Sequence, residues 1–253
     1  MSRTRTAVIL AAGMGTRLGD LTSHKPKALQ VVAGKTLLER SLRFTHLIGV
    51  SKTIVLGGYL IEQVRAEVNR MALPNVVVVE NPNYASTQRM SSLLCAKDQI
   101  DGDLIVFDGD YLYHRAIADF VRNSEYKDVT MHGSRQESDY FMQDYVLVTD
   151  EHGNLINARK IAKPIPLMSN EIYFASLLYC PKDHLAGLMN VGISLVSSQT
   201  EGVHVEDAVL EYSRTISPVK IVDLGLPMWV EVDRPEELEA ANRFAKDNLA
   251  FLA

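Results

Sequence analysis

Residues 7–29, AVILAAGMGTRLGDLTSHKPKAL, combine an apolar run, a glycine-rich turn and two basic side chains. The apolar residues 7–10 predict a short buried strand that runs directly into Gly13 and Gly15. Glycine lacks a Cβ and tolerates positive φ, so such a turn lets backbone N–H groups approach a phosphate. Arg17 and Lys27 add a guanidinium fork and a mobile ammonium, which both suit phosphate oxygens. The stretch predicts an anion-binding loop.

The known phosphate-loop patterns do not match this turn. A dinucleotide fingerprint requires a third glycine where Leu18 stands, and a Walker loop requires Gly-Lys-Ser/Thr five residues beyond Gly13. An ordinary strand-to-helix turn with scattered surface charge is therefore the alternative interpretation of the same residues.

The composition limits the class of protein. The chain has 253 residues, is 47% hydrophobic and carries a formal net charge of −5, which argues against a nucleic-acid partner. An anionic substrate must then be met by a local positive patch. The two cysteines lack metal-ligand spacing, no apolar run approaches ~18 residues, and the amino terminus does not resemble a signal peptide. We expect a soluble, cytoplasmic protein without membrane insertion.

Strands and helices alternate in the first half of the chain. Helices are expected at 35–48, 60–70 and 115–123, and strands at 53–56, 76–79 and 104–107. This alternation predicts right-handed crossovers and a mostly parallel sheet, with ligands at the carboxyl ends of its strands. The second half predicts more antiparallel pairing among strands 129–131, 145–149, 155–158 and 172–179, with helices at 181–190 and 205–216.

Carboxylates follow two of the predicted strands. Asp108 and Asp110 come after strand 104–107, and such oxygens suit Mg²⁺, although Asp beside Gly is also typical of a solvated turn. Asp233 follows a strand at 228–232. With Pro235 and Glu236 it also forms the pattern of a helix N-cap with a capping box. Capping and metal binding need not exclude each other.

The segment LAAGMGTRL (10–18), followed by KPKAL (25–29), resembles the signature loop of a nucleotidyltransferase family. Its members join a nucleoside triphosphate to a phosphorylated small molecule and release pyrophosphate. NPNYASTQRMSSL (81–93) resembles the nucleoside pocket of the cytidylyltransferase branch, which uses phosphocholine, related phospho-alcohols or phosphonates. That branch often has two asparagines where this chain has Gln88 and Arg89.

The resemblance implies an α/β fold: one three-layer αβα, Rossmann-like domain over residues 1–253 with a mixed, mainly parallel sheet. Residues 1–125 would hold the nucleotide and residues 126–253 the acceptor. Mg²⁺ would be bound by Asp110 and Asp233, with Glu231 completing the Glu-x-Asp pattern. Asp108 would be a neighbouring carboxylate that supports Asp110 or faces solvent.

The resemblance also implies the substrate contacts. Arg17 would hold the β- and γ-phosphates, Lys27 the α-phosphate or the leaving group, and Gln88 with Ser92 the base. The remaining nucleotide contacts would come from Leu10, Ala12, Gly13, Gly15 and Thr16.

The acceptor contacts are implied on two segments of the second half. Lys163, ahead of strand 172–179, would hold the acceptor phosphate, and Lys160 is its rival. Asp144 and Tyr145 resemble an acid–aromatic pair of phosphocholine enzymes, and such a pair attracts an ammonium by charge and cation–π contact, ~0.5–2 kcal/mol per ring. An amphipathic strand explains the same residues.

The expected function is Mg²⁺-dependent transfer of CMP from CTP to a small phosphorylated alcohol or phosphonate that carries an amine. A sugar-1-phosphate uridylyl- or thymidylyltransferase is the alternative enzyme, and a catalytically silent nucleotide-binding module is a third hypothesis. The histidines, including His132 and His204, show no nucleophile or ligand spacing and are interpreted as surface or loop residues. Glu206 and Asp207 are interpreted as helix N-terminal acids. A homo-oligomer is possible.

Overall fold

The computed structural model describes residues 4–136, 145–161, 165–199, 202–225 and 228–248. Its main sheet contains nine of the described strands: β1 (Arg5–Leu10), β4 (Lys52–Gly57), β5 (Val76–Glu80), β6 (Asp103–Asp108), β8 (Thr130–Ser134), β9 (Tyr145–Thr149), β10 (Leu155–Lys160), β11 (Glu171–Cys180) and β12 (Lys220–Asp223). Two further antiparallel sheets have two strands each: β2 (Val31–Val32) with β3 (Lys35–Thr36), and β7 (Tyr111–Tyr113) with β13 (Trp229–Glu231).

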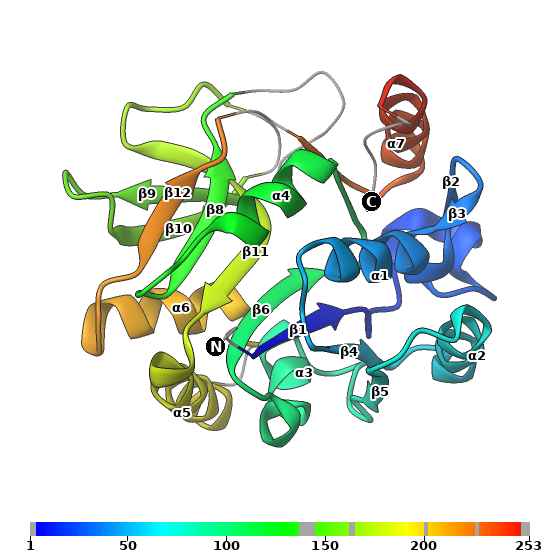
Figure 1. The fold of residues 1–253 in the computed structure, drawn as a ribbon, viewed down its shortest axis with the longest axis horizontal. Coiled ribbons are helices and arrows are strands. Elements are labelled where there is room, and N and C mark those ends of the chain that lie inside the picture. The colour runs from blue at the N-terminus through cyan, green and yellow to red at the C-terminus, as the bar shows by residue number, and fades with distance from the viewer. Residues whose placement is uncertain (1–3, 137–144, 162–164, 200–201, 226–227, 249–253) are drawn as a thin grey trace.

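The strand order is β10-β9-β11-β6-β1-β4-β5, and β8 pairs with β11 and β12 (Figure 1). Strands β6, β1, β4 and β5 run parallel to one another, as the alternation in the first half predicts. In the second half β11 is antiparallel to β6, β8 and β9, while β12 is parallel to β8. Because β11 pairs directly with β6, strands of both halves share one mixed sheet.

Seven α-helices lie in the described residues: α1 (Leu37–Leu47), α2 (Ile61–Met71), α3 (Arg89–Cys95), α4 (Arg115–Asn123), α5 (Lys182–Ser198), α6 (Val205–Thr215) and α7 (Pro235–Asp247). Helices α1, α2, α4 and α7 contribute to one hydrophobic core, and α3, α5 and α6 contribute to the other (Figure 1). Among the described residues, no helix is long and apolar enough to cross a membrane.

Successive side chains of the central strands point to opposite faces of the sheet and so contribute to both hydrophobic cores. In β1, Ala7 and Ile9 enter the first core, whereas Val8 between them enters the second. In β6, Phe107 and Val106 divide in the same way. A strand whose successive side chains are buried on opposite faces must be covered on both sides. This confirms the predicted three-layer α/β fold.

Two helices differ from their predicted bounds for local reasons. Helix α1 begins at Leu37 rather than at residue 35 because Thr36 is its N-cap, with its side chain accepting a hydrogen bond of 3.0 Å from the backbone N–H of Glu39. Helix α5 extends eight residues beyond the predicted end, through Gly192. A Cβ on Gly192 would lie 2.0 Å from Met90 Cε, so the glycine allows α5 to pack closely on α3.

Strand β11 contains a β-bulge near the carboxyl end of β6. Its register with β8 shifts between Phe174 and Leu177, and Ser176 adopts a φ of +49°, which is unusual for a residue with a Cβ. The bulge directs the Ser176 hydroxyl to the carboxyl end of β6, where it donates a hydrogen bond of 2.7 Å to Asp108 Oδ2.

Candidate active site

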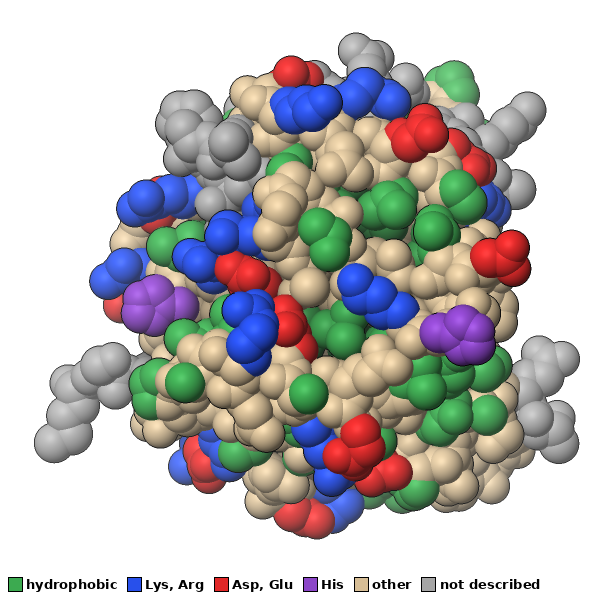
Figure 2. All heavy atoms as spheres, turned by 90° about the vertical axis from the view of Figure 1, so that its right-hand side faces the viewer, with side chains coloured by type: hydrophobic (Ala, Val, Ile, Leu, Met, Phe, Trp, Pro, Cys, Tyr) green, Lys and Arg blue, Asp and Glu red, His purple; other side chains and the backbone are tan. Residues whose placement is uncertain are grey.

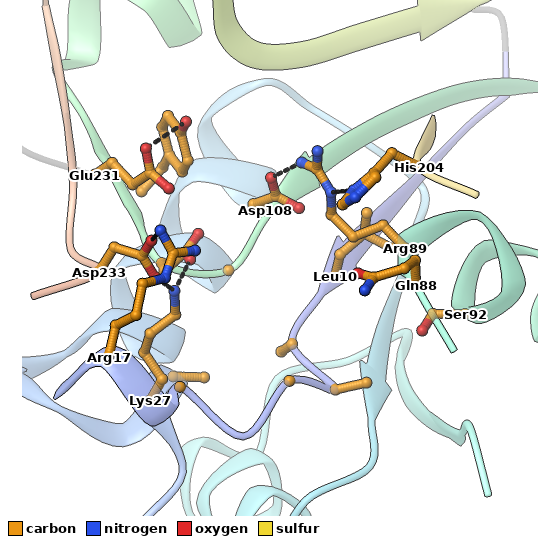
Figure 3. Close-up of a pocket in the computed structure, with 18 of the residues that line it drawn as sticks. Leu10, Arg17, Lys27, Gln88, Arg89, Ser92, Asp108, His204, Glu231 and Asp233 are labelled. Atoms are coloured by element: carbon orange, nitrogen blue, oxygen red, sulfur yellow. Dashed lines mark hydrogen bonds and ion pairs between the residues drawn. The ribbon is translucent and has the colours of Figure 1, made fainter. Parts of the chain in front are cut away.

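A cavity of about 270 Å³ lies at the carboxyl ends of β1 and β6 (Figure 3). It is lined by side chains from both halves of the chain, from the 10–17 loop to the 204–206 and 231–233 segments. On the face shown in Figure 2, acidic and basic side chains are interspersed and form no broad basic patch. An anionic ligand must therefore be recognised by the groups inside the cavity.

The glycine loop forms one wall of this cavity through the residues predicted to contact the nucleotide, Leu10, Ala12, Gly13, Gly15 and Thr16. A Cβ built on Gly13 would meet no atom within 4 Å, which leaves its backbone open to a ligand. Gly15 has a φ of +65°, and a Cβ there would lie 2.8 Å from Lys27 Cβ. Glycine at this position therefore allows both the turn and the close approach of Lys27.

Five charged residues, Arg17, Lys27, Asp110, Glu231 and Asp233, form what we call the Lys27 cluster. The Lys27 ammonium lies 2.7 Å from Asp233 Oδ1 and also pairs with Asp110. Arg17 pairs with the other oxygen of Asp233. The structure therefore brings together residues that are more than 200 positions apart.

The pKa shifts follow from this pairing. Burial lowers the pKa of Lys27, but the charges of Asp110 and Asp233 outweigh burial and keep the pKa above its ordinary value. Burial raises the pKa of Asp110, against the opposing charge of Lys27. Asp233 is also buried, yet Lys27 and Arg17 lower its pKa. Lys27 therefore stays an ammonium at neutral pH.

The acidic members of the Lys27 cluster have the donor set of a divalent cation site. One carboxylate oxygen from each of Asp110, Glu231 and Asp233 lies within 4.8 Å of the others. Asp110 Oδ1 is buried and makes no hydrogen bond to a described residue. The Tyr111 hydroxyl donates a hydrogen bond of 3.1 Å to Glu231 Oε2 and so orients that carboxylate. Hard carboxylate oxygens with one orphaned acceptor fit Mg²⁺.

The capping role predicted for Asp233 is wrong. Helix α7 begins at Pro235 with Arg234 as its N-cap, and Glu237 rather than Glu236 is the acidic partner. Glu237 Oε2 accepts hydrogen bonds of 2.6 and 2.9 Å from the backbone N–H groups of Asp233 and Arg234. Because Glu237 satisfies the helix terminus, the Asp233 carboxylate turns to the cations of the cavity.

A second charged group, which we call the Arg89 cluster, lies across the cavity from the Lys27 cluster (Figure 3). It consists of Arg89, Asp108, Glu206 and His204. Arg89 pairs with Asp108, and its Nη2 lies 2.7 Å from both oxygens of Glu206. Arg89 Nε also donates a hydrogen bond of 3.4 Å to His204 Nδ1.

Sequence reasoning missed this cluster. Asp108 does not face solvent but is 8% exposed, and Glu206 is 2% exposed within the cavity wall. Only Asp207 has the predicted helix-terminal role, since its Oδ2 accepts a hydrogen bond of 2.8 Å from the backbone N–H of His204. The histidine interpretation is wrong for His132, which is fully buried in β8. His204 does lie in the loop before α6, but it also lines the cavity. The one available signal was Arg89 itself, where the related branch often has asparagine.

The predicted base and acceptor contacts are partly in place. Gln88 and Ser92 line the cavity, and Ser92 Oγ accepts a hydrogen bond of 2.8 Å from Asn81 Nδ2. Tyr145 and Lys160 line it from β9 and β10. The predicted residues Lys163 and Asp144 lie outside the described residues.

The comparisons with known proteins agree with this geometry. The family model described as "MobA-like NTP transferase domain" matches residues 7–137, which is more than half of the chain. The chain belongs to this family. The match contains the glycine loop, Lys27, Arg89 and Asp110, so the first-half contribution to both clusters lies within the family domain.

Two of the relatives of this NTP transferase have names that denote cytidylyl transfer. It is 30% identical over 157 residues to choline-phosphate cytidylyltransferase of Streptococcus pneumoniae, covering 60% of this chain and 67% of the relative. It is 34% identical over 112 residues to CMP-5'-(3-aminopropyl)phosphonate synthase of Streptomyces rubellomurinus, covering 44% of this chain but only 18% of that longer protein. These relatives confirm the predicted resemblance to the phosphocholine and phosphonate branch.

Comparison with solved structures supports the fold. The CTP:phosphocholine cytidylyltransferase of Streptococcus pneumoniae superposes with a TM-score of 0.77 at 21% sequence identity, covering 96% of this chain and 99% of that chain. The predicted mixed α/β architecture is therefore shared along nearly the full length of both proteins.

Proposed function

We propose that this NTP transferase moves CMP from CTP to a small phosphorylated alcohol or phosphonate and releases pyrophosphate. The observation that carries the proposal is the position of Lys27, which is paired with Asp110 and Asp233 beside the open glycine loop. Two anions must meet for this reaction, and their repulsion is the main obstacle. A largely buried lysine beside carboxylates that suit a metal ion can neutralise part of the phosphate charge and so reduce that repulsion.

In the proposed reaction an acceptor phosphate or phosphonate oxygen attacks the α-phosphorus of the triphosphate. A new oxygen–phosphorus bond forms while the bond to the bridging oxygen of the pyrophosphate breaks. The negative charge leaves with pyrophosphate, so no protein nucleophile is required. Positioning and charge neutralisation are then the contributions of the protein.

The described residues have distinct proposed roles. Arg17, at the rim of the cavity, holds the β- and γ-phosphates, and Lys27, deeper in the cavity, contacts the α-phosphate or the leaving group. The acceptor phosphate is bound by Lys163, which the resemblance favours, or by its rival Lys160, which lines the cavity. Mg²⁺ held by Asp110, Glu231 and Asp233 would supply Lewis-acid neutralisation of phosphate charge when bound.

CTP is proposed as the nucleotide on two grounds. The 81–93 segment resembles the cytidylyltransferase branch, and its Gln88 and Ser92 line the cavity where a base would enter. Both relatives described above carry names that denote cytidylyl chemistry. The acceptor class rests on the same relatives, whose names refer to choline phosphate and to an aminoalkyl phosphonate.

The test is a panel of CTP, UTP, dTTP, ATP and GTP with phosphocholine, aminoethylphosphonate or hexose 1-phosphates, in the presence of Mg²⁺. Pyrophosphate release should require CTP and an amine-bearing acceptor. Turnover only with UTP or dTTP and a hexose 1-phosphate would replace the proposal by sugar-nucleotide synthesis. Lys27→Ala should lower turnover by roughly a hundredfold, whereas the surface variant Lys97→Ala should not; unchanged release with Lys27→Ala would refute the role of Lys27.

A further inference from the structure

Asn81 is the first residue after β5, and only 2% of it is exposed. Its backbone N–H donates a hydrogen bond of 2.8 Å to the carbonyl oxygen of Gly57 at the end of β4. Its side-chain amide makes three further hydrogen bonds, to Asn83, Thr87 and Ser92. Because Thr87 and Ser92 line the cavity, Asn81 connects this part of the cavity wall to the carboxyl edge of the sheet.

The direction of each side-chain hydrogen bond of Asn81 follows from one backbone group. The backbone N–H of Asn83 can only donate, so the Asn81 atom that it meets at 3.0 Å is the acceptor Oδ1. The other end of the amide is then Nδ2, which can only donate, and it meets the hydroxyls of Thr87 at 3.0 Å and Ser92 at 2.8 Å. Both hydroxyls are therefore acceptors toward Asn81.

The protons of these two hydroxyls have to point elsewhere. Thr87 donates its proton to the carbonyl oxygen of Asn83 at 2.8 Å. The Ser92 proton points away from Asn81, because an N–H of Asn81 already occupies the contact between the two side chains. Ser92 is 6% exposed and lines the cavity, and a buried hydroxyl proton requires an acceptor. A ligand atom that contacts Ser92 from the cavity is therefore best matched when it is an acceptor.

The base of the nucleotide is expected on this side of the cavity. Figure 3 shows Leu10, Gln88 and Ser92 together, across the cavity from Arg17 and Lys27, to which the phosphates are assigned. Cytosine and uracil differ at the ring atom N3, which is an acceptor in cytosine and carries a hydrogen in uracil. A hydroxyl donor in the cavity wall therefore matches cytosine N3 and opposes uracil N3–H.

We propose that Asn81 is a positioning residue that holds the Ser92 hydroxyl as a donor toward N3 of the base and so favours cytosine over uracil. This inference rests on the proposed function and assigns its choice of nucleotide to a hydrogen-bond direction that the fold sets. Asn81 acts through Ser92. A contact between two donors leaves both without an acceptor, which lowers affinity by roughly tenfold to a hundredfold.

Asn81→Asp tests the hydrogen-bond direction with almost no change of shape. The carboxylate replaces the donor Nδ2 by an acceptor oxygen, so Ser92 turns its proton to that oxygen and presents a lone pair to the base. The measurement is calorimetric titration with CTP and with UTP in Mg²⁺, which requires no turnover. The wild type should bind CTP about tenfold or more tighter than UTP, and Asn81→Asp should reduce this ratio to about threefold or less. The added negative charge weakens both nucleotides alike and cancels in the ratio.

Two further variants assign the effect to Ser92. Asn190→Asp makes the same chemical change on the exposed surface of α5 and should keep the wild-type ratio. Ser92→Ala removes the hydroxyl and should also reduce the ratio to about threefold or less. Adding Asn81→Asp to Ser92→Ala should change the ratio no further, because a residue that acts through Ser92 has no effect once that hydroxyl is gone.

Several results would overturn the inference. They are equal affinities of the wild type for CTP and UTP, a wild-type ratio in Asn81→Asp, and a further fall of the ratio in the double variant. A wild-type ratio in Ser92→Ala would overturn it whether or not Asn81→Asp folds. Failure of the proposed function is a separate result, namely the expected preference for CTP in binding without pyrophosphate release from any of the acceptors.

Discussion

The Lys27 cluster and the Arg89 cluster face each other across one cavity, yet they differ in how their charges are satisfied. In the Lys27 cluster three carboxylates exceed two cations, and Asp110 Oδ1 is orphaned. In the Arg89 cluster the guanidinium is fixed by Asp108 and Glu206. The Lys27 cluster can therefore bind an added cation, whereas the charged groups of the Arg89 cluster are largely paired with one another. The comparison predicts that substitutions in the first affect catalysis and that substitutions in the second affect stability.

The largest expected effect is on catalysis through Asp110. Asp110→Asn should lower kcat/KM for pyrophosphate release by roughly a thousandfold, about 4 kcal/mol of transition-state stabilisation, because a neutral amide is a poor substitute for an anionic ligand. The melting temperature should change little because Lys27 retains Asp233. The exposed variant Asp98→Asn is the control. A loss of less than tenfold would argue against a metal-binding role for Asp110.

Arg89→Met should produce the largest loss of folding stability. The free energy of unfolding should fall by about 3 kcal/mol because Glu206 would stay buried without its partner. Urea denaturation measures this change. The double variant Arg89→Met, Glu206→Met should recover part of the loss, because Asp108 still lacks its cation, and the exposed control Arg115→Met should change stability by less than about 0.5 kcal/mol. If the double variant is no more stable than the single one, the ion pair is not the cause.

The third prediction concerns the loss of folding stability at low pH, which we assign to His132 and to neither cluster. Burial lowers the pKa of His132 to about 4, and its ring nitrogens lie 2.7 Å from the Tyr126 hydroxyl and 3.0 Å from the Leu177 carbonyl. Protonation therefore favours the unfolded state, in which the pKa is near 6.5. The stabilisation that neutral His132 gives the folded state is therefore fully present above about pH 6.5 and is lost as the pH falls toward 4.

The corresponding measurement is urea unfolding at several pH values. Stability should fall by about 2 kcal/mol between about pH 7 and about pH 5 through His132 alone. His132→Gln should remove most of this slope, whereas Arg89→Met should keep it. If the free energy of unfolding of His132→Gln still falls with pH as in the wild type, another group causes the acid sensitivity.

The smallest effect concerns the support of Asp108 by Ser176. Ser176→Ala removes the hydroxyl that donates to Asp108 and keeps a Cβ at a φ of +49°. Ser176→Gly removes the same hydrogen bond but relieves the backbone strain. The alanine variant should therefore be about 1 kcal/mol less stable than the glycine variant. Equal melting curves for the two variants would indicate that the φ of Ser176 carries no strain.

Most of the fold could be predicted from the sequence because its signals are local. The apolar runs of β1, β4 and β6 and the helical periodicity between them indicate a parallel α/β sheet from neighbouring residues alone. The extent of α5 was not predictable in this way. The contact that Gly192 makes with Met90 of α3 depends on the tertiary structure, so the sequence around Gly192 does not reveal that the helix continues there.

The Lys27 cluster could also be predicted, but only with the help of a resemblance. Glycines after a strand and carboxylates at strand ends are chemical patterns that a sequence displays, whereas their convergence in one cavity depends on β1, β6 and β13 ending at the same place. The Arg89 cluster has no such pattern. Arg89 and Glu206 are 117 residues apart. Glu206 alone is typical of the first turn of a helix, and nothing near Arg89 in the sequence indicates its partner.

By itself the sequence determined the glycine-rich loop with its basic residues at 7–29, the α/β class and the acids at the strand ends, since each depends on residue type and short-range spacing. Only the tertiary structure decided what those acids do. Glu237 caps α7 and leaves Asp233 to Lys27, while Arg89 and Ser176 orient Asp108. The physical reason is that a carboxylate binds whichever donors the fold brings within hydrogen-bonding distance, and those donors come from distant segments.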